Sequence, residues 1–236
     1  MATLYLIPVT LGDTPLARVL PPLNHDITVG IRHFIVEEVR TARRFLRQVD
    51  KDIDIDALTF YPMGKHADKA LFMSYLEPLR HGQDMGIISE AGCPAIADPG
   101  ADVVALAQAE GIRVVPLVGP SSILLSLMAS GFNGQSFAFH GYLPIGSRER
   151  LSAIKRMETT AQNAHQTQLF IETPYRNHQM IKDLLATCHP NTRLCIAAGI
   201  TCGDREYIHT KTIRQWKHDL DQLPDLKKTP AIFLIG

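Results

Sequence analysis

The sequence predicts an α/β protein whose first half is built from strand–helix–strand units around a mostly parallel sheet. Three observations predict this fold class: short apolar runs alternate with helical patterns, small-residue turns follow several of the apolar runs, and the pattern changes near Gly131. Ligands of such sheets bind at the carboxyl ends of the strands. The 236 residues are 45% hydrophobic, which is enough to bury the core of one large or two small domains.

The stretch SEAGCPAIADPG at residues 89–100 is the densest cluster of turn residues in the chain. An apolar run at 85–88 precedes it and a helical pattern follows it, so we expect a strand-to-helix connection. Its alanines and Gly92 leave the backbone open to a ligand. Asp98 followed by Pro99 suits an N-cap and a first helical position, so we expect Asp98 to cap a helix rather than to catalyse.

The remaining elements are expected on the same grounds, with a domain boundary between Gly119 and Gly131 that gives domains at 1–120 and 121–236. Residues 146–156 are polar and basic. Strands are expected at 4–9, 33–38, 58–62, 85–88, 114–118, 137–143, 169–172, 194–198, near 207–211 and at 231–235. Helices are expected at 39–49, 70–79, 99–109 and 123–128, after Thr173-Pro174, and around Trp216.

Four arginines fall at positions i, i+3, i+4 and i+7 of the predicted helix 39–49, and therefore along one stripe of its surface. Such a stripe is either a solvated face or a face for an anion, because arginines without interleaved acids repel one another. Glu37 and Glu38 are near enough in sequence to neutralise part of the charge. The stripe consists of Arg40, Arg43, Arg44 and Arg47.

Composition excludes several classes of protein. Lys plus Arg and Asp plus Glu both number 24, so no global basic field favours nucleic acid, although a local patch would serve. The uncharged stretch 114–132 is broken by prolines and glycines, and no signal peptide precedes the first strand, so we expect a cytoplasmic protein without a membrane segment. The four cysteines form no CxxC pair, so we expect reduced, mostly buried thiols and no metal site.

Familiar phosphate and hydrolase motifs are missing. Neither GxxxxGK[ST] nor GxGxxG occurs, and no serine stands in a nucleophile elbow. Ser121 and Ser122 stand where a helix is expected to begin, which favours a capping role. The small-residue loops at strand ends suit a flat, mostly neutral ligand that backbone groups recognise.

Five segments together resemble one known family. SEAGCPAIADPG is similar to S-D-A-G-T-P-x-I-S-D-P-G, and Glu37 with three arginines of the stripe matches A-E-D-T-R-x-T-R-R. GPSS at 119–122, GYLP at 141–144 and ETPYR at 172–176 are similar to P-G-P-S-A, G-F-L-P and E-S-P-H-R. Over nearly its whole length the chain resembles the tetrapyrrole methylase superfamily of S-adenosylmethionine (SAM)-dependent methyltransferases. The closest branch is that of the ribosomal RNA 2'-O-ribose methyltransferases.

The resemblance implies two α/β domains with SAM in the cleft between them, usually in a homodimer. The first domain would carry the substrate side and part of the cofactor cleft, and the second domain the rest. Carried over position by position, the cofactor contacts would be Pro8, Gly92, Ile96, Ser121, Ser122, Ile171, Gly199, Pro230 and Ala231.

The chain departs from the branch pattern at several points. PVTLGD at 8–13 is shorter than P-I-G-N-L-G-D and lacks its first glycine, and Glu38 and Val39 replace Asp and Thr of the arginine segment. AGITC at 198–202 stands where the family has R-E-L-T-K, and ribosomal members usually continue beyond the position of Gly236 into a small helical domain.

The function expected from these features is transfer of a methyl group from SAM to a ribose in ribosomal RNA. A ribose hydroxyl needs a base, and the candidates are Glu37 at the end of the second predicted strand and Lys65 and His66 after the third. The arginine stripe would hold RNA phosphates. Two alternatives stay open: C-methylation of a tetrapyrrole or another small anionic acceptor, whose carboxylates would meet the same stripe, and a SAM-binding regulatory module without turnover.

Overall fold

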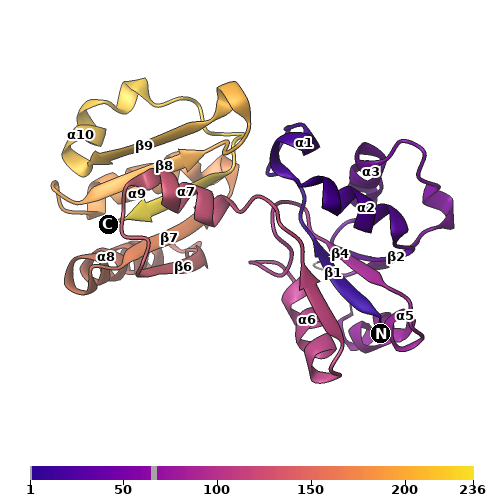
Figure 1. The fold of residues 1–236 in the computed structure, drawn as a ribbon. Coiled ribbons are helices and arrows are strands. Elements are labelled where there is room, and N and C mark those ends of the chain that lie inside the picture. Colours follow the sequence, from indigo (N-terminus) through magenta and orange to yellow (C-terminus); the bar gives the residue numbers. More distant parts are fainter. Residues whose placement is uncertain (1, 65–67) are drawn as a thin grey trace. The chain divides into compact units, whose positions relative to one another are not determined.

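The computed structural model describes residues 2–64 and 68–236, which divide into two compact units, Met1–Ser121 and Ser122–Gly236. Each unit contains one five-stranded sheet with helices on its faces (Figure 1). The strands are β1 (Thr3–Ile7), β2 (His33–Val36), β3 (Thr59–Pro62), β4 (Met85–Ile88), β5 (Arg113–Pro116), β6 (Phe137–Tyr142), β7 (Thr167–Glu172), β8 (Arg193–Ala198), β9 (Tyr207–Thr212) and β10 (Ala231–Ile235). The α-helices are α1 (Leu16–Val19), α2 (Pro22–Gly30), α3 (Val39–Val49), α4 (Phe72–Tyr75), α5 (Glu77–Arg80), α6 (Gly100–Ala109), α7 (Ser122–Ser130), α8 (Ser147–Ala164), α9 (Asn177–Thr187) and α10 (Ile213–His218).

The first unit is a fully parallel sheet in the order β3-β2-β4-β1-β5, as the sequence predicts. Successive strand residues point to opposite faces, so both faces are apolar. Phe34, Val36 and Ile88 pack against Phe45 and Leu46 of α3 on one face. On the other face, the buried side chains of β1, β2 and β4 pack against α4, α5 and α6.

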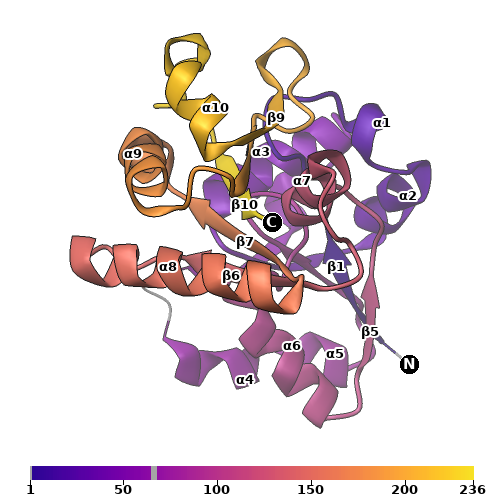
Figure 2. The same ribbon diagram turned by 90° about the vertical axis from the view of Figure 1, so that its left-hand side faces the viewer.

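The second unit contains a mixed sheet, whose strand directions the sequence analysis did not predict. Its strand order is β6-β7-β10-β8-β9, and only β6 and β7 run parallel. The connection from β8 to β9 is too short for a helical crossover, so these two strands form an antiparallel pair. Figure 2 shows α8, α9 and α10 along one face of this sheet, where Phe170 and Phe233 stack with ring centroids 5.5 Å apart within the core.

The expected helix at 70–79 is broken. A 3-10 turn at Lys69–Leu71 leads into α4, and the chain restarts as α5 after Leu76. Pro78 explains the break, because proline has no N–H for the preceding turn and is tolerated only in the first turn of a helix. The sequence also did not predict α1 and α2, which fill residues 16–30, and α8 extends the polar segment 146–156 to Ala164.

Candidate functional site

Segments that follow β1, β4 and β5 meet at the carboxyl edge of the first sheet. The N–H of Val9 donates to the carbonyl oxygen of Gly92 at 3.0 Å, which closes an isolated antiparallel bridge between the two loops. The thiol of Cys93 lies 3.5 Å from the carbonyl oxygen of Pro120. The structure therefore brings Pro8, Gly92 and Ser121, three predicted cofactor contacts, into neighbouring loops of the first unit.

Gly92 has a conformational reason of its own to be glycine. Its φ angle is +70°, in the left-handed region that side-chain-bearing residues avoid. A Cβ there would lie 3.1 Å from Leu11 Cδ2 and 3.3 Å from the carbonyl oxygen of Pro120. Substitution of Gly92 would thus strain the loop itself, so it does not isolate an effect on a ligand.

The Asp98 side chain organises the second half of the 89–100 loop. Its Oδ1 accepts the N–H groups of Ala95 at 3.0 Å and Gly100 at 2.7 Å, so it binds the first N–H of α6. The predicted N-cap position is wrong, because Pro99 and not Asp98 is the N-cap of α6. The helix α6 begins at Gly100, one residue after the predicted start at Pro99. Burial raises the pKa of Asp98, and the two N–H donors offset part of this rise. Ala95 and Ala97 both have positive φ, a local strain that is common near functional sites.

The predicted arginine helix is confirmed at both ends, since α3 spans Val39–Val49. All four arginines are exposed, but they are not equivalent. Arg43 forms an ion pair with Asp56 at 2.8 Å, whereas Arg40, Arg44 and Arg47 have no carboxylate partner among residues 2–64 and 68–236. The expected neutralisation by Glu38 is not a side-chain pairing, because its carboxylate accepts the backbone N–H of Arg40 at 3.2 Å.

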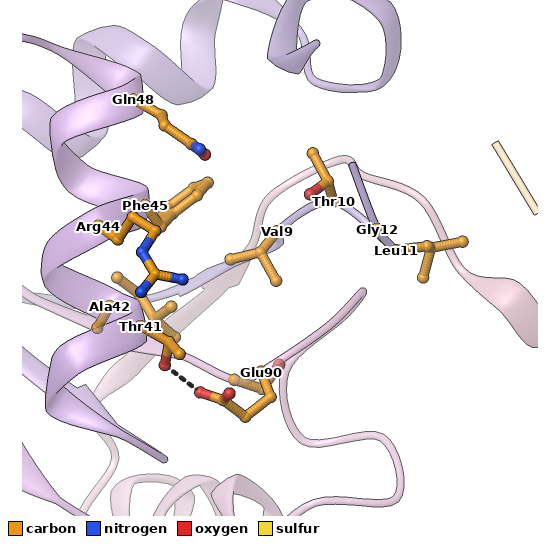
Figure 3. Close-up of a pocket in the computed structure, with 12 residues that line it drawn as sticks. Val9, Thr10, Leu11, Gly12, Thr41, Ala42, Arg44, Phe45, Gln48 and Glu90 are labelled. Atoms are coloured by element: carbon orange, nitrogen blue, oxygen red, sulfur yellow. Dashed lines mark hydrogen bonds between the residues drawn. The ribbon is translucent and has the colours of Figure 1, made fainter. Parts of the chain in front are cut away.

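A pocket of about 240 Å³ lies between α3 and the segments that follow β1 and β4, and we call it the α3 pocket (Figure 3). Gln48 extends from the helix toward Thr10, and the Arg44 guanidinium turns toward Thr41. The Thr41 hydroxyl donates to Glu90 Oε1. Glu90 in turn donates its N–H to Glu37 Oε2 at 3.2 Å. The α3 pocket is lined by Val9, Thr10, Leu11, Gly12, Thr41, Ala42, Arg44, Phe45, Gln48, Ile88, Ser89 and Glu90.

Of the three predicted base candidates, the structure places one. Glu37 is half-buried directly after β2, and its carboxylate contacts the loop that follows β4 through the N–H of Glu90. Lys65 and His66 lie outside the described residues. Glu37 therefore stays a candidate at the carboxyl edge of the sheet, next to the α3 pocket.

The predicted cofactor residues of the second unit gather at one end of the β7–β10–β8 strands. Ile171 pairs with Ile232, and Ala231 pairs with Ala198. The N–H of Gly199 donates to the carbonyl oxygen of Pro230 at 3.2 Å. Gly199 has φ +59°, and a Cβ there would lie 2.4 Å from the carbonyl oxygen of Arg205, so only glycine fits. Ser122 is the first residue of α7 in the same unit.

Sequence reasoning missed the partners that tie these segments together. Thr41 and Glu90 are 49 positions apart and carried no motif as a pair. In ETPYR, the four-residue spacing of Glu172 and Arg176 was a usable signal, because the two side chains form an ion pair at 2.6 Å. Within the described chain, no three His, Cys, Asp or Glu residues gather as a metal site, and no helix is long and apolar enough to cross a membrane.

Comparison with known proteins finds sequence relatives named ribosomal RNA small subunit methyltransferase I. No family model matches the chain. It is 29% identical over 211 residues to ribosomal RNA small subunit methyltransferase I of Halalkalibacterium halodurans, covering 87% of this chain and 67% of that protein. The protein of the same name from Vibrio cholerae is 27% identical over 200 residues, covering 84% of this chain and 65% of its own length. The chain thus spans about two thirds of these relatives.

Solved structures give the fold. The crystal structure of the methyltransferase CobJ superposes with a TM-score of 0.63 at 15% identity, covering 100% of this chain and 93% of CobJ. The cobalt precorrin-4 methyltransferase CbiF gives a TM-score of 0.60 at 13% identity over 99% of this chain and 94% of that one. These likenesses confirm the predicted architecture of two α/β domains.

Proposed function

We propose that this chain, a homologue of the ribosomal RNA small subunit methyltransferases I with the two-domain fold of tetrapyrrole methylases, transfers a methyl group from SAM to a ribose 2'-oxygen of ribosomal RNA. One observation carries the proposal: relatives of that name align over 84–87% of the chain. An alignment of 200 residues is longer than either compact unit, so it draws on both.

The residues present fit a cofactor of this kind. Ile96 is 54% exposed on the 89–100 loop, an apolar side chain that the first unit leaves uncovered. Ala95 and Ala97 beside it leave the backbone accessible, and the strand ends around Ala231 supply further small residues. When bound, SAM supplies an electrophilic methyl group on a sulfonium. Its proposed contacts are the carried-over residues, with Ile96 providing apolar contact.

The arginine stripe would bind the RNA. Arg40, Arg44 and Arg47 are exposed and without carboxylate partners among the described residues, so phosphates can reach them without displacing a protein anion. Arg43 already pairs with Asp56, and we assign it a smaller share of the phosphate contacts.

Among the residues that the structure describes, Glu37 is the proposed base that accepts the proton of the ribose hydroxyl. A carboxylate at this position holds the proton while the oxygen forms its new bond to carbon. Lys65 and His66 are the other two proposed candidates. Positioning of the hydroxyl by the stripe would supply much of the rate, since fixing two reactants contributes up to about 7–11 kcal/mol in well-oriented cases. We further propose that the protein acts in the cytoplasm as a homodimer.

Two measurements test this function. Titration calorimetry is expected to show SAM binding, and labelled methyl from SAM is expected to enter small-subunit ribosomal RNA in an alkali-resistant 2'-O-methyl form. Ile96→Asp is expected to weaken SAM binding without a change in circular dichroism. Leu23→Asp on α2, where the native side chain is 61% exposed against 54% for Ile96, is expected to leave SAM binding intact. Failure of SAM to bind contradicts the proposal.

A second candidate function is C-methylation of a tetrapyrrole. The observation that favours it is the fold, which is shared with a cobalamin biosynthetic methyltransferase and a uroporphyrin-III-C-methyltransferase. Arg40 and Arg44 would then bind the acceptor's carboxylates. Label in a tetrapyrrole and none in RNA favours this alternative, and SAM binding with no labelled acceptor favours a regulatory module.

A further inference from the structure

We propose that the α3 pocket binds one ribonucleotide unit of the substrate, with its phosphate on Arg44 and a ribose hydroxyl on Glu90. This inference rests on the proposed function, because it concerns the RNA that the enzyme would methylate. It adds a recognition site and assigns roles to Thr41 and Glu90, which the sequence analysis did not connect as a pair.

Size comes first. Pockets that enclose whole drug-sized ligands measure roughly 300–1,000 Å³. At about 240 Å³, the α3 pocket is smaller than this range, so it suits one unit of a longer molecule rather than a whole cofactor or a macrocycle. A single nucleotide within a strand is a unit of this kind.

The two walls of the pocket carry opposite charge. On the helix wall, Arg44 reaches toward the pocket with no carboxylate partner among the described residues, and Arg40 and Arg47 continue the positive charge along α3 (Figure 3). A ligand with one negative group would need only Arg44. Three exposed arginines in a row favour a chain of phosphates that passes over the pocket.

The opposite wall selects what lies beside the phosphate. Thr41 donates to one oxygen of Glu90, which fixes the carboxylate and leaves its other lone pairs free to accept hydrogen bonds. A neutral hydroxyl is a suitable donor. The carboxylate edge of a tetrapyrrole is not, because it would be repelled by Glu90 and by the neighbouring Glu37. The acidic wall therefore favours ribose over a polycarboxylate acceptor.

The rest of the pocket suits the uncharged part of a nucleotide. Val9, Phe45 and Ile88 give it an apolar lining, and Gln48 and Thr10 place an amide and a hydroxyl at its edge. Such a mixture of apolar surface with a few polar groups is typical of small-ligand sites.

The test is binding of the four ribonucleoside 5'-monophosphates and their 2'-deoxy counterparts to the full chain, followed by NMR titration. We expect saturable binding of the ribonucleotides in the millimolar range and weaker binding of the deoxynucleotides. Arg44→Gln is expected to weaken both series about tenfold or more, since it removes a charge-assisted hydrogen bond. Glu90→Ala and, as an independent variant, Thr41→Val are expected to remove the preference for ribose.

Arg113→Gln is the matched control, because Arg113 is an exposed arginine of the same unit at the start of β5, whereas the pocket lies at the carboxyl edge. Equal affinity for ribo- and deoxynucleotides, no saturable binding, or equal losses in Arg44→Gln and Arg113→Gln would overturn the inference. Calorimetry with SAM and methyl incorporation are measured on the same samples. Methylation of RNA without the expected changes in nucleotide affinity would contradict the role of the α3 pocket alone. Nucleotide binding without methyl transfer to RNA would contradict the proposed function.

Discussion

Arg150 of α8 and Arg44 of α3 show how differently one residue type is used in the two units. Arg150 is 8% exposed, forms an ion pair with Asp183 at 2.7 Å and donates to the carbonyl oxygen of Ile145 at 2.6 Å. Arg44 is exposed beside a pocket, and no carboxylate pairs with it among the described residues. The first arginine is fully used by the fold, and the second is available to a ligand.

The comparison of Arg150 with Arg44 shows that the number of arginines on a helix does not by itself indicate nucleic-acid binding. The expected role follows from what each guanidinium already contacts. Removing one partner of a buried ion pair destabilises the fold. Substituting an exposed arginine that has no partner changes ligand binding rather than the free energy of unfolding.

The largest effect is expected for Arg150→Met. Removing the guanidinium leaves Asp183 buried without its counter-ion, so the free energy of unfolding is expected to fall by about 3–5 kcal/mol. Urea denaturation measures this loss. The double variant Arg150→Met with Asp183→Leu is expected to recover most of it, because both charges are then gone. A single variant as stable as the wild type would mean that this pair is not a structural one.

The next effect concerns RNA affinity. Arg40→Ala and Arg44→Ala are each expected to weaken RNA binding and to lower the salt dependence of log K by about 0.7 per lost phosphate contact with a single strand. Stability and SAM affinity are expected to stay near the wild-type values. Filter binding across a salt series checks this, with Arg113→Gln as the control. Unchanged RNA affinity at every salt concentration would remove the electrostatic support for the ribose acceptor and favour a small-molecule acceptor.

A smaller effect, on the pH dependence of stability, is expected from the half-buried Asp98. Backbone N–H groups bind its carboxylate, whereas the Asp183 carboxylate pairs with an arginine. Burial raises its folded-state pKa above the ordinary 3.8, so the folded protein binds the proton more tightly than the unfolded chain does. Stability from this group is therefore present at low pH and is lost as pH rises from 3.8 through the raised pKa. Asp98→Asn keeps the acceptor oxygen and is expected to flatten this part of the stability–pH profile. Stability–pH profiles of the same shape for the wild type and Asp98→Asn would contradict the raised pKa of Asp98.

The smallest effect is expected for Arg43→Gln. Its ion pair with Asp56 is exposed, 48% and 88% for the two side chains, so its loss is expected to change the free energy of unfolding by about 1 kcal/mol or less. RNA affinity is expected to fall less than in Arg40→Ala, because Asp56 already occupies this guanidinium. A loss as large as that of Arg40→Ala would show that the four arginines act equally.

Local patterns were sufficient for much of the fold. The bounds of α3, β4 and β10 match the prediction because each is a clear periodic or apolar segment bounded by turn residues. The exposed arginine stripe also follows from spacing alone. The strand order of the second sheet does not, since β10 enters between β7 and β8 from the end of the chain.

The site was harder to predict for the same reason. Nothing in the sequence distinguishes Arg43 from Arg44, because the partner Asp56 is brought close by the turn after α3. Residues 146–156 appeared polar and basic, yet Arg150 within them is buried by its pairing with α9. The α3 pocket depends on Thr41 meeting Glu90, a contact between distant segments that only the parallel sheet creates.

The decisive experiment for the proposed ribose methylation is to map 2'-O-methyl groups in small-subunit ribosomal RNA from cells with and without the gene. We expect that a ribose methyl is missing without the gene, returns with the wild-type chain, and does not return with the chain that carries both Arg40→Ala and Arg44→Ala. Identical methyl maps with and without the gene would contradict it.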